Sequence, residues 1–188
     1  MHAFWLSTLV VFVAELGDKS QLMALTFATR FKAWQVLVGI TVATAIVHLG
    51  SVALGAGVGA ALPTTAITVV AGLAFLGFAA WTLRGDSLDE EERSKAATAT
   101  RAAILAVGVA FFLAELGDKT MLATVTLATR EGWFGTWVGS TLGMVAADAL
   151  AIGAGVWLGR ALPERAVRYG AATAFAVFGL LLVGQALV

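Results

Sequence analysis

The hexapeptide AELGDK occurs twice in this chain, at residues 14–19 and 114–119, and each copy lies inside a long apolar stretch. The similarity extends beyond the hexapeptide, because residues 14–30 match residues 114–130 at eleven of seventeen positions. A constant offset of one hundred residues indicates an internal duplication. The fold must therefore accommodate two similar units, each with a Glu, an Asp and a Lys in an apolar segment.

The composition indicates a membrane protein. Of the 188 residues, 60% are hydrophobic and 13% are charged, and the mean hydropathy is +0.90. Repeated apolar stretches of about 18–25 residues are typical of membrane-spanning helices. The absence of cysteine excludes disulfides and thiolate metal sites. We expect six spans, at residues 4–27, 36–60, 66–83, 102–126, 134–158 and 168–187.

The odd number of spans in each unit determines the expected topology. Three spans per unit force the second unit to enter the membrane from the opposite side. We therefore expect an all-α integral membrane protein with six transmembrane helices in two inverted three-helix repeats, at residues 1–83 and 102–188. Residues 84–101 are expected to form a charged cytoplasmic linker. Nine Lys and Arg residues lie in loops 1–2, 3–4 and 5–6 and one lies on the other face, which places these loops in the cytoplasm and both termini outside.

The charges of the two motifs are too costly to face lipid. At the centre of a membrane helix, each Asp, Glu or Lys costs roughly 2.5–3.5 kcal/mol, so three cost roughly 7–10 kcal/mol. In a continuous helix, Glu15, Asp18 and Lys19 share one face, because residues three and four positions apart are neighbours. We expect Glu15, Asp18, Glu115 and Asp118 to face the interior and to converge where the first and fourth spans cross.

Glycines predict two kinds of backbone feature. Gly17 and Gly117, inside the motifs, leave room for close backbone approach or local unwinding. Glycines spaced by four residues are typical of close helix–helix packing in membranes. They are Gly55 and Gly59, Gly135, Gly139 and Gly143, and Gly155 and Gly159.

The charge and the donor atoms of the motifs predict a divalent cation as ligand. Four carboxylates and two lysines have a formal charge of −2 when all are ionised. Ser20, Thr120 and Gln21 add two hydroxyls and an amide. Such oxygen donors suit calcium, manganese or magnesium and are poor ligands for copper(I). Met121 occupies the position equivalent to Gln21, and its sulfur either favours manganese over calcium or only packs.

Four further ionisable residues are expected to support the site or its coupling to protons. An ammonium has no lone pair for a cation, so Lys19 and Lys119 are expected to pair with acidic residues. Asp148 and His48 lie at equivalent positions, each in the middle of a span. Asp148 is a candidate fifth ligand or proton carrier. His48 is a candidate titrating group or an interhelical hydrogen-bonding residue.

The paired E-L-G-D-K-[ST] motifs resemble the signature E-x-G-D-[KR]-[ST] of the calcium/manganese–proton antiporter family of bacteria, chloroplasts and the Golgi, which is related to the lysine exporter superfamily. The resemblance covers essentially the whole chain. It implies that Glu15, Asp18, Glu115 and Asp118 bind the transported metal and that the bacterial role is similar to manganese export. Family members commonly have Gln after the Ser or Thr, whereas the second copy has Met121, so the choice between manganese and calcium stays open.

These expectations describe a secondary transporter and not an enzyme. It would export manganese, or calcium next, in exchange for protons, with no cofactor beyond the transported cation. The expected partners are the metal ion, protons and the lipid bilayer. Zero net charge argues against nucleic acid, and a homo-oligomer is left open. The short chain without a transit peptide is expected in a prokaryotic plasma membrane.

Four alternative interpretations lead to different expectations. Inverted repeats favour alternating access over a passive divalent-cation channel, but only a measurement of proton coupling decides between them. An exporter of an organic cation or amino acid follows from superfamily analogy. An intramembrane aspartyl protease would need the motif G-x-G-D, but Glu15 and Glu115 stand where its first glycine would be. Glu–Lys pairs that merely neutralise themselves within each copy would explain neither the additional Asp nor the duplication.

Overall fold

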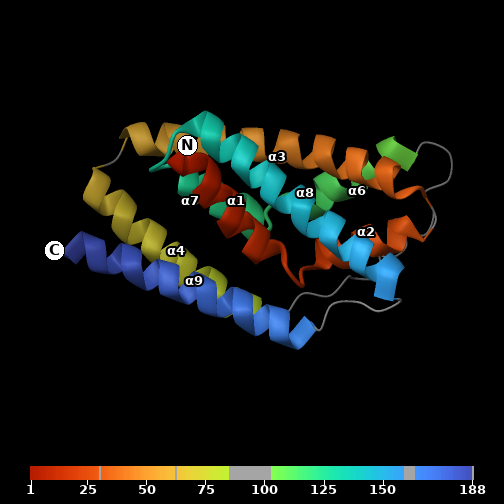
Figure 1. The fold of residues 1–188 in the computed structure, drawn as a ribbon. Coiled ribbons are helices and arrows are strands. Elements are labelled where there is room, and N and C mark those ends of the chain that lie inside the picture. The colour runs from red at the N-terminus through yellow and green to blue at the C-terminus, as the bar shows by residue number, and fades with distance from the viewer. Residues whose placement is uncertain (30, 62, 85–102, 159–163, 188) are drawn as a thin grey trace.

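The chain folds into helices throughout the part that the structure describes. The computed structural model describes residues 1–29, 31–61, 63–84, 103–158 and 164–187. In these ranges there are eight α-helices and no strands (Figure 1): α1 (His2–Glu15), α2 (Lys19–Ala28), α3 (Ala33–Ala61), α4 (Thr64–Arg84), α6 (Ala103–Glu115), α7 (Lys119–Ala128), α8 (Trp133–Leu158) and α9 (Glu164–Leu187). Each helix of the first half has a counterpart about one hundred residues later. The expected charged linker, beyond Arg84, lies outside the described residues.

The first and fourth expected spans are each broken into two helices. α1 ends at Glu15 and α2 begins at Lys19, and the same break separates α6 from α7. Gly17 has φ 75° and Gly117 has φ 80°, and no other described residue has a positive φ. Glycine adopts this conformation without a Cβ clash, so it can end the helix inside the motif. The expected unwinding is confirmed, whereas the continuous helical face expected for Glu15, Asp18 and Lys19 is wrong.

The breaks also affect which helices can cross a membrane unaided. Among the described residues, Ala33–Ala61 and Trp133–Gly155 are long and apolar enough to do so. In the two broken segments, the helices before the breaks, His2–Glu15 and Ala103–Glu115, are shorter apolar helices. The outer surface is apolar: Trp5 is 63% exposed, Leu105 67% and Leu180 61%. So many exposed large apolar side chains suit a lipid environment better than water. The structure thus gives an all-helical chain with two clear candidate spans, where six were expected.

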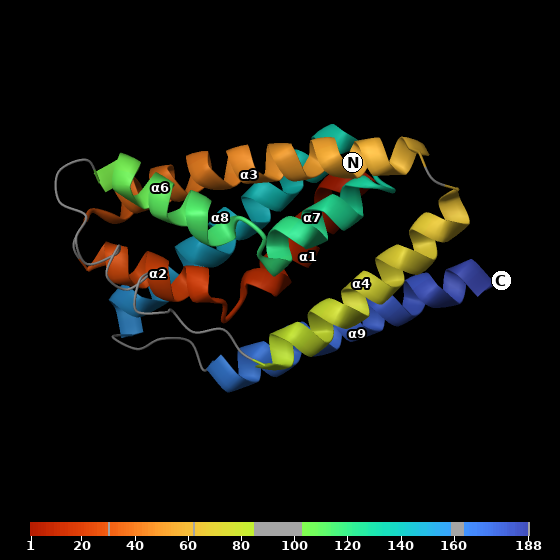
Figure 2. The same cartoon turned by 180° about the vertical axis from the view of Figure 1, so that it is seen from behind.

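The two halves of the chain pack into each other. α1 lies along α8, α3 lies along α6 and α7, and α4 lies along α9. The pair α4 and α9 is antiparallel and forms one side of the molecule, as Figure 2 shows from behind. Phe75, Phe78, Phe175 and Phe178 join these two helices through ring contacts with centroid separations of 4.8–6.0 Å. Every major helix pair therefore joins the first half to the second.

Glycines allow these helices to approach closely. A Cβ atom on Gly139 would lie 2.3 Å from the backbone oxygen of Phe4 in α1, and one on Gly55 would lie 2.3 Å from that of Val125 in α7. Real Cβ atoms do not come so close, so no side chain fits at either position. The expected packing role is confirmed for six glycines, while Gly159 lies outside the described residues; the six are Gly55, Gly59, Gly135, Gly139, Gly143 and Gly155.

Candidate metal site

The two breaks meet through ion pairs between the motifs. Lys119 pairs with Asp18, and Lys19 Nζ lies 3.6 Å from Asp118 Oδ1. The expected pairing of both lysines with acidic residues is confirmed. Each lysine reaches the aspartate of the other motif, an exchange that a Glu–Lys pair confined to one copy would not produce. The two copies of the motif therefore form one site.

Burial makes this site expensive and asymmetric. Glu15, Asp18 and Asp148 are fully buried, and Glu115 and Asp118 are 1% and 5% exposed. A buried charge is stable only when it is paired or neutralised. The lysine side chains differ, because that of Lys119 is 3% exposed and that of Lys19 is 20% exposed. One of the two ion pairs is therefore enclosed, and the other is partly open.

The two glutamates have different hydrogen bonds although their motifs are the same. Thr120 Oγ1 donates to Glu115 Oε2 at 2.9 Å. Within the described part of the chain, neither carboxylate oxygen of Glu15 has a hydrogen-bond partner, and Ser20 Oγ has none either. Buried oxygen atoms without a donor are rare in folded proteins and costly. These atoms are suited to accept a cation.

The carboxylates act on one another as a single charged cluster. The negative charges of Glu115, Asp18 and Asp148 all act on Glu15, as does the positive charge of Lys119. Asp148 also acts on Asp18. The four motif carboxylates, Asp148 and the two lysines have a formal charge of −3 when all are ionised. Repulsion of this kind in a buried cluster is relieved by a cation or by protons.

Gln21 and Met121 hold the two breaks. Gly17 N donates to Gln21 Oε1 at 2.8 Å, and Gln21 Nε2 donates to the backbone oxygen of Ala147 in α8 at 2.9 Å. In the second copy, Gly117 N donates to Met121 Sδ at 3.1 Å. Both polar atoms of Gln21 are thus used by the backbone, and the sulfur of Met121 also has a structural partner. The sequence did not predict either role, because each glycine N–H becomes available to these side chains only where the helix is broken.

Asp148 and His48 occupy matching positions on α8 and α3. Both are fully buried. Neither carboxylate oxygen of Asp148 and neither ring nitrogen of His48 has a hydrogen-bond partner among the described residues. The expected hydrogen-bonding role of His48 therefore finds no partner in that part of the chain. The charge of Asp148 reaches both motif glutamates, which brings α8 into the cluster.

The donor groups are close but are not arranged around an ion. No set of three or more His, Cys, Asp or Glu side chains in the described ranges is positioned to hold a metal ion. Asp18 and Asp118 form ion pairs with the lysines instead. A cation that binds here must therefore compete with an ammonium group and draw the carboxylates together.

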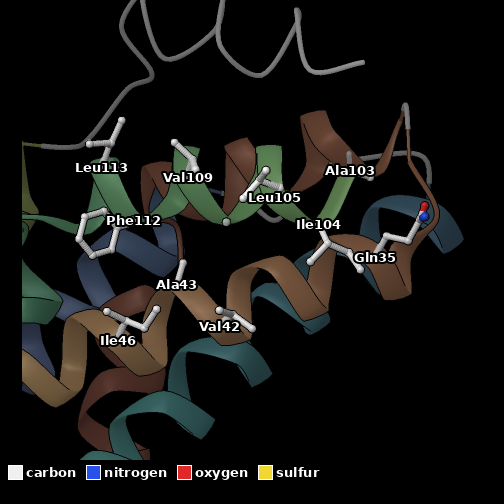
Figure 3. A pocket seen from close by; sticks show the side chains of 11 residues that line it. Gln35, Val42, Ala43, Ile46, Ala103, Ile104, Leu105, Val109, Phe112 and Leu113 are labelled. Carbon is white, nitrogen blue, oxygen red and sulfur yellow. The ribbon is translucent and has the colours of Figure 1, made fainter. Parts of the chain in front are cut away.

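Two cavities lie apart from this cluster. An open groove of about 650 Å³ between α3 and α6 is lined by apolar side chains apart from Gln35 at one end, as Figure 3 shows. No residue that lines it is ionisable, so it is unsuited to a cation. A smaller cavity of about 180 Å³ is lined partly by Arg130 and Glu131, and His2 Nδ1 lies 3.1 Å from Glu131 Oε2 there.

Known proteins resemble this chain over most of its length. The family model "Divalent cation/proton antiporter GDT1" matches residues 3–90 and 103–188. A Vibrio cholerae protein named "Putative manganese exporter" is 37% identical over 151 residues, which are 79% of this chain and 74% of that protein. The chloroplast protein PAM71 of Arabidopsis thaliana is 29% identical over an alignment of 204 residues, covering 94% of this chain and 55% of that protein. The GDT1-like protein sll0615 of Synechocystis is 27% identical, with 96% of each chain covered. No solved structure matches significantly.

Proposed function

Because the chain belongs to the GDT1 family of divalent cation/proton antiporters, we propose that it exports manganese from the cytoplasm in exchange for protons. Calcium is the second candidate substrate, since the same oxygen donors suit both ions. The choice of manganese is supported by the relative whose name refers to manganese export. The observation that carries the proposal is the buried cluster in which each motif holds the other through a lysine–aspartate pair.

The proposed architecture is six spans in two inverted three-helix repeats. Its support is the correspondence of α1, α2, α3 and α4 with α6, α7, α8 and α9 at an offset of about one hundred residues. Two broken segments in matching positions, with charged residues at the breaks, are typical of secondary transporters. The distribution of Lys and Arg supports cytoplasmic loops 1–2, 3–4 and 5–6, with both termini outside a cell membrane.

In the proposed cycle the cation binds to Glu15, Asp18, Glu115 and Asp118, with hydroxyl oxygens from the residues that follow the lysines. Manganese and calcium take oxygen ligands, and the lysine ammoniums can serve only as substitute charges when the ion is absent. Protons entering from outside neutralise the carboxylates and release the metal. Their departure toward the cytoplasm restores the site, so metal leaves the cell only while protons enter.

Transport by purified protein in vesicles tests this function. With an imposed pH gradient, wild-type protein is expected to move manganese, and calcium more weakly, against the proton flow. Asp18→Asn and Asp118→Asn are each expected to abolish the exchange, because an amide neither ionises nor takes up a proton over this range. Glu131→Gln is the matched control, since Glu131 lies outside the cluster beside His2.

Three outcomes would contradict the proposal. Manganese flux that is independent of the pH gradient would identify a passive channel. Flux that survives in both Asn variants would show that the motif aspartates are not part of the exchange site. Export of an organic cation without manganese would instead support the superfamily analogy.

A further inference from the structure

Three buried side chains near the first motif have no hydrogen-bond partner for any of their oxygen atoms among the described residues. In that part of the chain, the first motif and α8 contribute Glu15 at the end of α1, Ser20 in the first turn of α2, and Asp148 in the middle of α8, whereas Oε1 of Glu115 has no partner in the second motif. All three residues are fully buried. Three helices thus contribute unsatisfied oxygen donors to the first motif.

The packing of α8 places Asp148 at the level of the first break. Its glycines contact α1 before the break and α2 after it: a Cβ on Gly139 would meet Phe4, and one on Gly155 would meet Leu25. Asp148 lies between these two glycines in the sequence of α8. It is therefore level with the segment between the two contacts, which includes the break.

A hydrogen bond fixes this register. Gln21 Nε2 donates to the backbone oxygen of Ala147, the residue before Asp148. The same side chain accepts the bond from Gly17 N inside the break. One side chain therefore ties the break of the first motif to the part of α8 that carries Asp148. The charge interaction of Asp148 with Asp18 agrees with this placement.

The second motif lacks the same donor set. There the hydroxyl of Thr120 is already bonded to Glu115. The residue of α3 that corresponds to Asp148 is His48, which offers an imidazole and no carboxylate. Oε1 of Glu115 has no partner in the described part of the chain, so the second side offers one such oxygen, whereas the first offers three side chains whose oxygens are all unpartnered.

We propose that Asp148 is a direct ligand of the transported cation and that, with Glu15 and Ser20, it forms a subsite on the first-motif side. This inference rests on the proposed function and deepens it, because it makes the site an asymmetric one with a ligand outside both motifs. A carboxylate, a second carboxylate and a hydroxyl are the donors that manganese, calcium and magnesium prefer. On binding, these side chains must move inward, since they are not at ligand distance in the structure.

Manganese is its own probe for this test, because its unpaired electrons report which atoms are bound to it. The chain has only two histidines, of which His2 is exposed and His48 is buried. In a His48→Gln background, Asp148→His would place an imidazole at the proposed ligand position. Pulsed electron paramagnetic resonance of the manganese-loaded protein in detergent is expected to show coupling to a ligand nitrogen in His48→Gln/Asp148→His and none in His48→Gln alone.

A binding titration with Asp148→Asn gives a second measurement that does not depend on the histidine variant folding. The amide keeps the size of the side chain and removes its charge. We expect manganese affinity to fall at least tenfold, with Glu131→Gln as the control that stays at the wild-type value. Asp18→Asn is included because its effect reports on the proposed function itself.

The outcomes separate the two ideas. Nitrogen coupling together with weakened binding in Asp148→Asn would support the ligand role. Two results would overturn this inference and leave the proposed function standing. One is manganese bound to His48→Gln/Asp148→His without nitrogen coupling. The other is wild-type affinity in Asp148→Asn while Asp18→Asn loses binding. Absence of manganese binding in the wild-type protein would overturn both.

Discussion

Replacing Gly117 tests whether the break in the second motif is required for cation binding. Gly117 has φ +80°, and a Cβ atom added there would meet nothing within 4 Å. A side chain at this position therefore causes no clash, and its whole effect comes from the backbone conformation. Few positions in the chain separate these two effects so clearly.

The expected magnitude follows from two terms. An L-residue in the left-handed region costs roughly 1–2 kcal/mol. Alanine also favours a continuous helix over glycine by about 0.8–1.0 kcal/mol. Gly117→Ala thus shifts the balance away from the break by about 2–3 kcal/mol, which corresponds to roughly a 30- to 150-fold change in the equilibrium. The apparent Kd for manganese is expected to rise by up to that factor, because only the broken form brings the two motifs together.

A series of side chains at this position makes the prediction sharper. Asparagine tolerates the left-handed region better than alanine, and β-branched valine tolerates it least. Manganese affinity, measured by titration of purified protein, is therefore expected to decrease from wild type through Gly117→Asn and Gly117→Ala to Gly117→Val. Gly153→Ala is the matched control, since Gly153 lies within helix α8 and a Cβ there also meets nothing within 4 Å. Equal affinities for the Asn, Ala and Val variants, or a loss as large in Gly153→Ala, would refute the reasoning.

Three further substitutions test other parts of the structure. Gly139→Ala would place a Cβ 2.3 Å from a backbone oxygen of α1, so it is expected to separate α1 from α8 by about 1 Å. Both thermal stability and transport should decrease in this variant, whereas Gly153→Ala should lower neither. Lys119→Met removes the enclosed ammonium that competes with the cation for Asp18. Manganese is therefore expected to bind more tightly in a titration, while the protein still inserts into the membrane. An unchanged Kd for manganese would count against competition by Lys119. Gln21→Met keeps an acceptor for the N–H of Gly17 but loses the hydrogen bond to Ala147 in α8. Thermal unfolding should then report a free energy of unfolding that is lower by about 1 kcal/mol. An unaltered melting temperature would show that the bond to α8 does not stabilise the protein.

Some features of the site could be predicted from the sequence because they depend on composition and repetition. The duplicated motif predicted helical repeats with equivalent residues. Because an ammonium has no lone pair for a cation, Lys19 and Lys119 were predicted to pair with acids. The partners could not be predicted, because Asp118 and Asp18 lie about one hundred residues away and no local rule selects them. The rule that neighbours three and four positions apart share a face applies only within a continuous helix, and Gly17 ends that helix.

The roles of Gln21 and Met121 could not be predicted for the same reason. Each side chain accepts a hydrogen bond from the N–H of the glycine in its motif. In an unbroken helix that N–H would instead bond to the carbonyl oxygen four residues earlier. The difference between Ser20 and Thr120 in hydrogen bonding was also hidden, because identical motifs lead to the same expectation for both copies. The position of Asp148 was predicted, but its proximity to the first motif depends on how α8 packs.

The exchanged ion pairs bear on the ancestry of the chain. Each half supplies an aspartate that pairs with the other half's lysine, so an isolated half would lose both of these ion pairs. Two identical halves in opposite orientations would satisfy all four groups at once. In the proposed inverted architecture, two copies of one unit would thus form a complete site, which agrees with an origin of the chain by duplication. The two halves are no longer identical, since His48 in the first half stands where the second half has Asp148.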